Sequence, residues 1–281
     1  MSGLGTRSQP QVSTPDTRTF VASVGRAFAG ALLFSLPMLM TMEMWWLGFI
    51  LDPWRIVIML VVVLPLLLGL SRYGGLRRTC RFRDDLADVL VAVLVAGFAS
   101  AIILSLFGII TPEMRAREVV GKIAIQLVPA SIGAMLARSQ LGETSDAAEE
   151  QDESYWGELF LMAIGALYLS LNVAPTEEMV LLAYKMSPWQ EVGLLLLSLG
   201  MMHAFVYSVG FKGGSLSEGR SFFDLFLRFT CAGYAVVLIV SLGVLWLFDQ
   251  TGDAPLHEII STTIVLAFPG ALGAAAARVV L

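Results

Sequence analysis

The chain has 281 residues, of which 57% are apolar and 15% are charged, with a mean hydropathy of +0.77. Because soluble domains carry roughly 25% charged residues, this composition excludes an ordinary soluble domain and indicates a polytopic membrane protein. The formal net charge of −5 says little about partners, since the side of the membrane on which charges lie matters more than their sum.

Residues 1–25 are rich in Ser, Thr, Pro and Gly and lack the apolar core and cleavage site of a secretory signal, which predicts a disordered cytoplasmic tail. Eight apolar segments follow, each close to the length of about 20 residues that a bilayer-spanning helix needs. We therefore predict an all-α fold with eight transmembrane helices, at about 27–50, 54–71, 86–110, 118–138, 157–184, 189–210, 222–248 and 257–280.

Two copies of one unit make up the membrane part. Residues 118–138 resemble residues 258–278 at a constant offset, with identical residues at Glu118/Glu258, Pro129/Pro269, Gly133/Gly273, Ala137/Ala277 and Arg138/Arg278. This similarity predicts tandem four-helix repeats at 26–141 and 156–281, joined by an acidic cytoplasmic linker at 142–155. Because each unit has an even number of helices, we expect parallel halves related by a pseudo-twofold axis along the membrane normal.

Each repeat carries a glutamate inside its first apolar segment. "TMEM" (41–44) corresponds to "TEEM" (176–179), so Glu43 matches Glu178, whereas Glu177 has no counterpart and points about 100° away around a helix. A carboxylate in hydrocarbon costs about 2.5–3.5 kcal/mol, so such residues usually face protein, water or an ion. We expect Glu43 and Glu178 to face a protein interior or an aqueous cavity.

Further oxygen donors lie near these glutamates. Pro37 and Pro175 each free a main-chain carbonyl, and transporters use such oxygens as cation ligands. Hard cations suit oxygen-rich sites, so Ca²⁺ is favoured over Na⁺, K⁺ or H⁺, with Glu43 and Glu178 as metal ligands. The alternative is structural: protonated glutamates that bond across a helix interface. The predicted pathway residues are Glu43, Glu178, Glu177, Thr41 and Thr176, with Asn172 as a secondary candidate.

Three other polar residues have two interpretations each. Glu118 and Glu258 begin their segments, where an acid either complements the helix dipole or attracts cations. His203 has no repeated counterpart, and it is either an interhelical hydrogen-bond partner or a proton-handling group.

Basic residues predict the orientation. If the N-terminus, the even-numbered loops and the C-terminus share one side, only five of the 18 Lys and Arg residues remain on the other: Arg55, Arg115, Arg117, Lys122 and Lys185. The positive-inside rule then places both termini in the cytoplasm.

No catalytic signature occurs in the sequence, which holds two His and two Cys residues, so we expect neither an enzyme nor a cofactor beyond a bound cation. The basic run "RRTCRFR" beside a helix end favours a contact with anionic lipids over a nucleic-acid site.

The motifs "TMEM" and "TEEM", together with P-x-x-[IL]-G-A-x-x-A-R at the end of each half, resemble an uncharacterised family of bacterial integral membrane proteins known as a domain of unknown function. The resemblance covers about residues 20–281. It implies a multi-pass protein of the bacterial inner membrane and brings no established activity.

Repeated intramembrane carboxylates favour a cation channel or transporter. The main alternative is a non-transporting membrane scaffold or sensor, and an intramembrane enzyme is a weaker third. Because cation-selective rings commonly use about four or more carboxylates, a homodimer would bring two copies each of Glu43 and Glu178 around one axis.

Overall fold

The computed structural model describes residues 17–73, 82–140, 155–210 and 226–280, and within these ranges it contains helices and no strand. The predicted all-α class is thereby confirmed. Residues 1–16 of the predicted tail and 142–154 of the predicted linker lie outside the described residues. The first helix begins at Thr17, inside the predicted tail of residues 1–25 and earlier than the predicted start at about residue 27.

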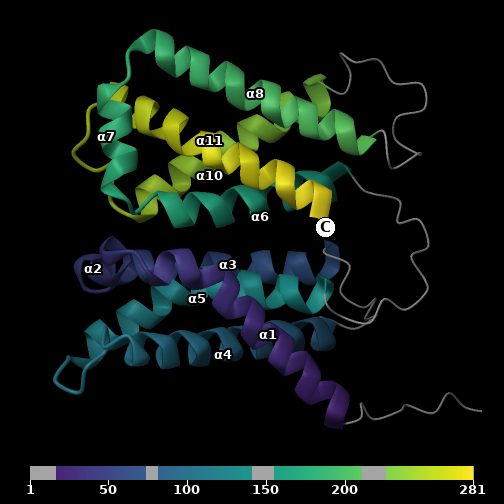
Figure 1. The fold of residues 1–281 in the computed structure, drawn as a ribbon, viewed down its shortest axis with the longest axis vertical. Coiled ribbons are helices and arrows are strands. Elements are labelled where there is room, and N and C mark those ends of the chain that lie inside the picture. The colour runs from purple at the N-terminus through teal and green to yellow at the C-terminus, as the bar shows by residue number, and fades with distance from the viewer. Residues whose placement is uncertain (1–16, 74–81, 141–154, 211–225, 281) are drawn as a thin grey trace, which may run out of the picture.

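The two halves of the chain have the same order of elements. The first half comprises α1 (Thr17–Leu39), α2 (Met42–Ile50), α3 (Pro53–Tyr73), α4 (Phe82–Leu106) and α5 (Ala116–Gln140). The second half comprises α6 (Tyr155–Val173), α7 (Glu177–Lys185), α8 (Pro188–Gly210), a π-helical turn η1 (Phe226–Cys231) that leads into α10 (Ala232–Leu247), and α11 (Leu256–Val280). The short helices α2 and α7 lie at one end of the molecule, here called the short-helix end, and the C-terminus lies at the other (Figure 1).

The prediction of single helices at 27–50 and 157–184 is wrong, because each segment is two helices separated by a break. Thr41 and Thr176 stand at the breaks in extended conformation, with φ and ψ of −97° and 127° and of −77° and 136°. Their hydroxyls donate to the carbonyls of Met38 (2.9 Å) and Val173 (2.8 Å). Apolar content continues across each break, so a scan for long apolar segments merges the two helices.

Seven helices in the described part of the chain are long and apolar enough to span a membrane: Val21–Leu39, Pro53–Tyr73, Phe82–Leu106, Ala116–Ala137, Tyr155–Val173, Phe226–Leu247 and Leu256–Ala277. These seven do not confirm the predicted count of eight, which stays a prediction. The segment predicted at 189–210 does form a helix, α8, and its described side chains end at Phe205.

Glycines allow the closest helix crossings, and they do so in both halves. A Cβ on Gly30 of α1 would overlap the carbonyl oxygen of Gly133 and the Cβ of Ala137, both on α5. In the second half, a Cβ on Gly165 of α6 would overlap the matching groups of α11, namely the Gly273 carbonyl and the Ala277 methyl group. Close approach of backbones at small residues is a common way to pack membrane helices.

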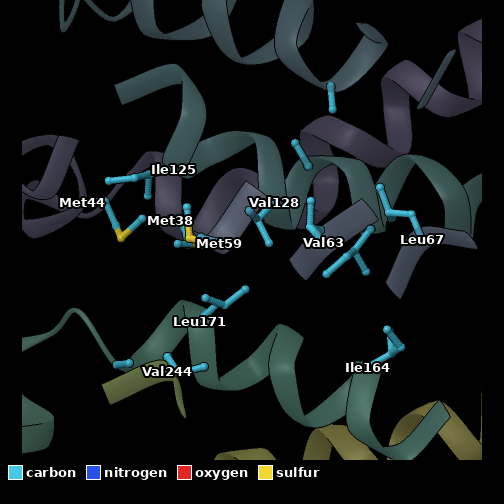
Figure 2. Packing of buried hydrophobic residues seen from close by; sticks show 14 of the residues in the cluster. Met38, Met44, Met59, Val63, Leu67, Ile125, Val128, Ile164, Leu171 and Val244 are labelled. Carbon is cyan, nitrogen blue, oxygen red and sulfur yellow. The ribbon is translucent and has the colours of Figure 1, made fainter. Parts of the chain in front are cut away.

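The halves meet through α3, α1 and α5 on one side and α6 with α10 on the other. Met59, Val63 and Leu67 face Ile164, Leu171 and Val244 in one continuous apolar core (Figure 2). At the short-helix end of this interface, the guanidinium of Arg55 donates to the Trp246 carbonyl and to Asp249 Oδ1, and it stacks on the rings of Trp54 and Trp246.

The two halves are stacked head to tail. From one end of this stack to the other, α4 comes first, then α5, then α3, followed by α6 and α10, then α11, and finally α8 (Figure 1). The helix α1 crosses α5 and α4 and also contacts α6, where Tyr168 Oη donates to the Phe34 carbonyl (3.1 Å). The predicted pseudo-twofold relation between the halves is not shown by the described residues and stays a prediction.

Candidate functional site: an acidic pocket at the short-helix end

A pocket of about 920 Å³ opens among α7, α8, α11 and the segment that precedes α11. This volume lies within the range of about 300–1,000 Å³ that is typical of small-molecule sites. The lining residues are Pro175, Thr176, Glu177, Glu178, Val180, Leu181, Ala183, Tyr184, Met186, Pro188, Glu191, Gln250, His257, Glu258, Ile260, Ser261 and Thr262.

Among the described residues, four carboxylates line this pocket and no Lys or Arg does. Each carboxylate belongs to the first turn of its helix: Glu177 and Glu178 in α7, Glu191 in α8 and Glu258 in α11. The positive end of a helix dipole interacts favourably with an acidic side chain in the first turn, so each of these glutamates occupies a position where acids are common. The pocket is thus acidic and attracts cations.

Hydrogen bonds hold the elements around the pocket together. Ser261 Oγ donates to Glu191 Oε1 (2.6 Å), which joins α11 to α8. Gln250 Nε2 donates to the Ala174 carbonyl (2.7 Å), which joins the segment before α11 to the break between α6 and α7. The Oε1 of Gln250 is buried and has no hydrogen-bond partner among the described residues.

The structure brings together part of the predicted site. Glu177, Glu178, Thr176 and Glu258 all line the pocket. Glu177, expected to point away from Glu178, is exposed like its neighbour and faces the same pocket.

The matching residues of the first half lie outside this pocket. Glu43 is partly exposed in the first turn of α2. Glu118 is paired with Lys122 one helical turn later (3.2 Å), and the Lys122 ammonium also donates to the Ile109 carbonyl (3.2 Å). The Thr41 hydroxyl donates to the Met38 carbonyl at the end of α1, as described above. In this half the carboxylate of Glu118 is neutralised by a nearly buried lysine.

Asn172 and His203 also lie outside the pocket. Asn172 is buried in α6, where its Nδ2 donates to the Tyr168 carbonyl (2.7 Å). His203 Nδ1 lies 2.9 Å from Thr230 Oγ1, and its ring meets Phe226 edge to face. These contacts favour the interpretation of His203 as an interhelical hydrogen-bond partner.

Sequence reasoning missed Glu191, Gln250, His257, Ser261 and Thr262. A search for features present in both repeats passes over these residues, because the positions that match Glu191 and Ser261 hold Ile56 and Gly121. A signal was nonetheless present: Glu191 directly follows the Pro188–Trp189 helix start, where an acid in the first turn is readily recognised.

Within the described ranges, no group of three or more His, Cys, Asp or Glu side chains is close enough to hold a metal ion. The four carboxylates are spread over three helices rather than gathered on one point. They could share a cation that keeps part of its water shell, or a cation of extended shape.

The comparisons with known proteins identify a family. Residues 23–281 match the family described as "Putative integral membrane protein (DUF2391)". No curated protein and no solved structure matches the chain. The match covers nearly the whole chain and agrees with its seven candidate spans, so the chain belongs to this family and is a multi-pass integral membrane protein.

Proposed function

We propose that this protein is a cation channel or transporter, and that its cation passes through the acidic pocket at the short-helix end. The observation that carries the proposal is the lining of the pocket: among the described residues it holds four carboxylates from three helices, one histidine, His257, and no Lys or Arg. A concave site of one charge sign raises the local concentration of ions of the opposite sign and speeds their entry.

The form of the site favours a hydrated cation. A fully dehydrated Ca²⁺ needs 6–8 oxygen ligands, and the described carboxylates do not converge as a group of three. A cation that keeps several waters can instead bridge Glu178, Glu191 and Glu258 through those waters. We propose Ca²⁺ as the first cation to test, with Na⁺, K⁺ and H⁺ as alternatives.

The proposal includes a tandem duplication in which both halves share one orientation. Its support is that local contacts recur at matching positions: the glycine crossings of α1 with α5 and of α6 with α11, and the threonine hydroxyl bonds that close α1 and α6. Both short helices also lie at the same end of the molecule (Figure 1).

We place the termini in the cytoplasm of a bacterial inner membrane, with the short-helix end facing outward. The basic residues at that end include Arg55 and Lys122, and each is paired with a carboxylate, Asp249 or Glu118. The positive-inside rule counts Lys and Arg residues, and in this orientation only five of the 18 lie on the outward side.

The test is flux through purified protein in liposomes, measured for Ca²⁺, Na⁺, K⁺ and H⁺. Glu178→Gln and Glu258→Gln keep size and hydrogen bonding but remove charge from the pocket. We expect each to lower the flux of the transported ion about tenfold or more. The matched control is Glu113→Gln, an exposed carboxylate of the first half that lies outside the pocket. A double Glu178→Gln, Glu258→Gln variant that folds and conducts like the parent would sink the proposal.

The Glu43→Gln variant tests whether the cation pathway includes the first half. If its flux also falls, the pathway includes the first half, as the repeated glutamates predict. If its flux is unchanged, the cation pathway is confined to the second half.

A further inference from the structure

The turn that follows α10 connects the first half of the chain to the wall of the pocket. Asp249 Oδ1 accepts a hydrogen bond from the guanidinium of Arg55 in α3 (2.6 Å). The next residue, Gln250, donates from Nε2 to the Ala174 carbonyl (2.7 Å), at the break that leads into α7. Two adjacent residues therefore link α3 to the start of the helix that brings two glutamates to the pocket.

The backbone of this turn has a conformation that favours glycine. The amides of Asp249 and Gln250 donate to the carbonyls of Trp246 (3.1 Å) and Leu245 (2.9 Å), which is the Schellman pattern of a helix C-terminus. Asp249 has a φ of 63°, in the left-handed region that glycine adopts more easily than any residue with a side chain. The turn by itself therefore gives no reason for an aspartate at this position.

The matching turn of the first half has a glycine there. After α4, the amides of Gly108 and Ile109 donate to the carbonyls of Ser105 (3.0 Å) and Leu104 (2.9 Å), and Gly108 has a φ of 69°. A glycine has no side chain with which to reach the other half. The aspartate of the second half is thus explained by its bond to α3 rather than by the turn.

Gln250 carries this link on to the pocket. It is among the described residues that line the pocket, and Arg55 and Asp249 are not. The residue that accepts its hydrogen bond, Ala174, is fully buried. A buried carbonyl that loses its donor finds no water to replace it, so the bond from Gln250 resists breaking. The start of α7 is held where this bond places it.

On the basis of the proposed function, we infer that Arg55, Asp249 and Gln250 are positioning residues of the cation site. They hold the start of α7 so that Glu177 and Glu178 face the cation, and none of the three has to touch it. Arg55 belongs to the half that does not line the pocket, so the contact between the halves sets the geometry of the site. Residues that orient ligands from behind typically change cation affinity about 10–100-fold.

Spin labels on two walls of the pocket test the positioning directly. In a background with Cys80→Ser and Cys231→Ser, labelled cysteines replace Leu181 of α7 and Ile260 of α11. Both residues line the pocket and are about half exposed, at 50% and 49%, so they accept a label. Electron paramagnetic resonance then gives the distribution of distances between α7 and α11, and this measurement needs no cation.

Two substitutions break the link at different points. Asp249→Gly suits the left-handed turn but loses the bond to Arg55, and Gln250→Leu loses the donor to the Ala174 carbonyl. We expect each variant to broaden the distribution of distances. We also expect each to raise, about tenfold, the concentration that gives half-maximal flux of whichever cation the parent transports among Ca²⁺, Na⁺, K⁺ and H⁺.

Two matched variants separate the link from the charge. Asp249→Asn keeps an oxygen that accepts from Arg55 and tolerates the left-handed turn, so it should behave like the parent. Asp253→Gly removes the same charge from an exposed residue outside the described lining and should also behave like the parent. Parent-like distances in Asp249→Gly, or an Asp249→Asn variant that behaves like Asp249→Gly, overturn the inference. A parent without flux of any of the four ions overturns the proposed function instead, and the label distances still decide whether the link positions α7.

Discussion

At the short-helix end of the first half, α2 lies directly on α5, because Gly48 and Gly121 meet there without side chains. In the second half, the matching residues are Ala183 and Ser261, and both line the pocket between α7 and α11. Alanine and serine thus replace the two glycines in the second half, and a pocket lies where the first half has direct backbone contact. The two halves therefore have the same order of helices but form different surfaces at the short-helix end.

Charge differs between the halves at the same place. Lys122 pairs with Glu118 in α5, whereas the matching Thr262 of α11 donates its hydroxyl to the main-chain carbonyl of Glu258 (2.6 Å). The residue at position 262 therefore gives Glu258 no positively charged partner. In the first half the acid is paired within its own helix, whereas in the second half the matching acid lines the pocket.

The largest expected effect is on stability, at the crossing of α2 with α5. Gly121→Ala would place a Cβ against the Gly48 carbonyl oxygen, an atom of the backbone that cannot turn aside. We expect a loss of about 3 kcal/mol in the free energy of unfolding, at the upper end of overpacking costs. Gly193→Ala in α8, where an added Cβ meets nothing within 4 Å, is the control and should be neutral or slightly stabilising. Unfolding followed in mild detergent measures both, and equal stability of the two variants would contradict the close crossing.

The next effect concerns the ion pair of the first half. Lys122→Met removes the partner of Glu118 and the donor to the Ile109 carbonyl, and we expect a loss of about 1–3 kcal/mol in unfolding free energy. Lys185→Met, at an exposed lysine of α7, should change stability little. If Lys122→Met matches Lys185→Met in chemical denaturation, the Lys122–Glu118 pair has no structural role.

Placing a lysine in the second half at the position that matches Lys122 should make the pocket less negative and less attractive to cations. Thr262→Lys places an ammonium one helical turn after Glu258, as Lys122 stands after Glu118. We expect cation flux to fall about tenfold, because the new charge repels the ion and pairs with the carboxylate. Thr262→Gln adds bulk without charge and serves as the control. Equal flux in the Lys and Gln variants would show that charge in the pocket is irrelevant to transport.

The smallest expected effect lies between the halves. Arg55→Lys keeps the charge but loses the planar group that stacks on two tryptophans and bonds two oxygens, so we expect a cost of about 1 kcal/mol. A double-mutant cycle with Asp249→Asn isolates the ion pair. A coupling energy of zero in that cycle would mean that stacking alone holds Arg55 in place.

Composition and apolar segments were sufficient to predict the fold class and most helices, because a bilayer imposes one length on every spanning element. The breaks at Thr41 and Thr176 could not be found in this way, since one extended residue scarcely changes the apolar content around it. Glu178 and Thr176 were predicted as site residues because polar groups in an apolar segment stand out. Glu191 and Ser261 were not, because their role depends on which helix faces them, and the pairing of helices is a property of the packed structure.

The glycine crossings have a consequence for how this protein tolerates mutation. Every amino-acid replacement of glycine adds at least one carbon atom, and at Gly30, Gly133, Gly165 and Gly273 that atom meets a backbone carbonyl rather than a flexible side chain. Any missense change in these four codons therefore forces two helices apart. The exposed faces of α1 and α8, in contrast, can exchange one small or apolar residue for another without such a shift, so random mutagenesis should return many viable changes there and few at the crossings.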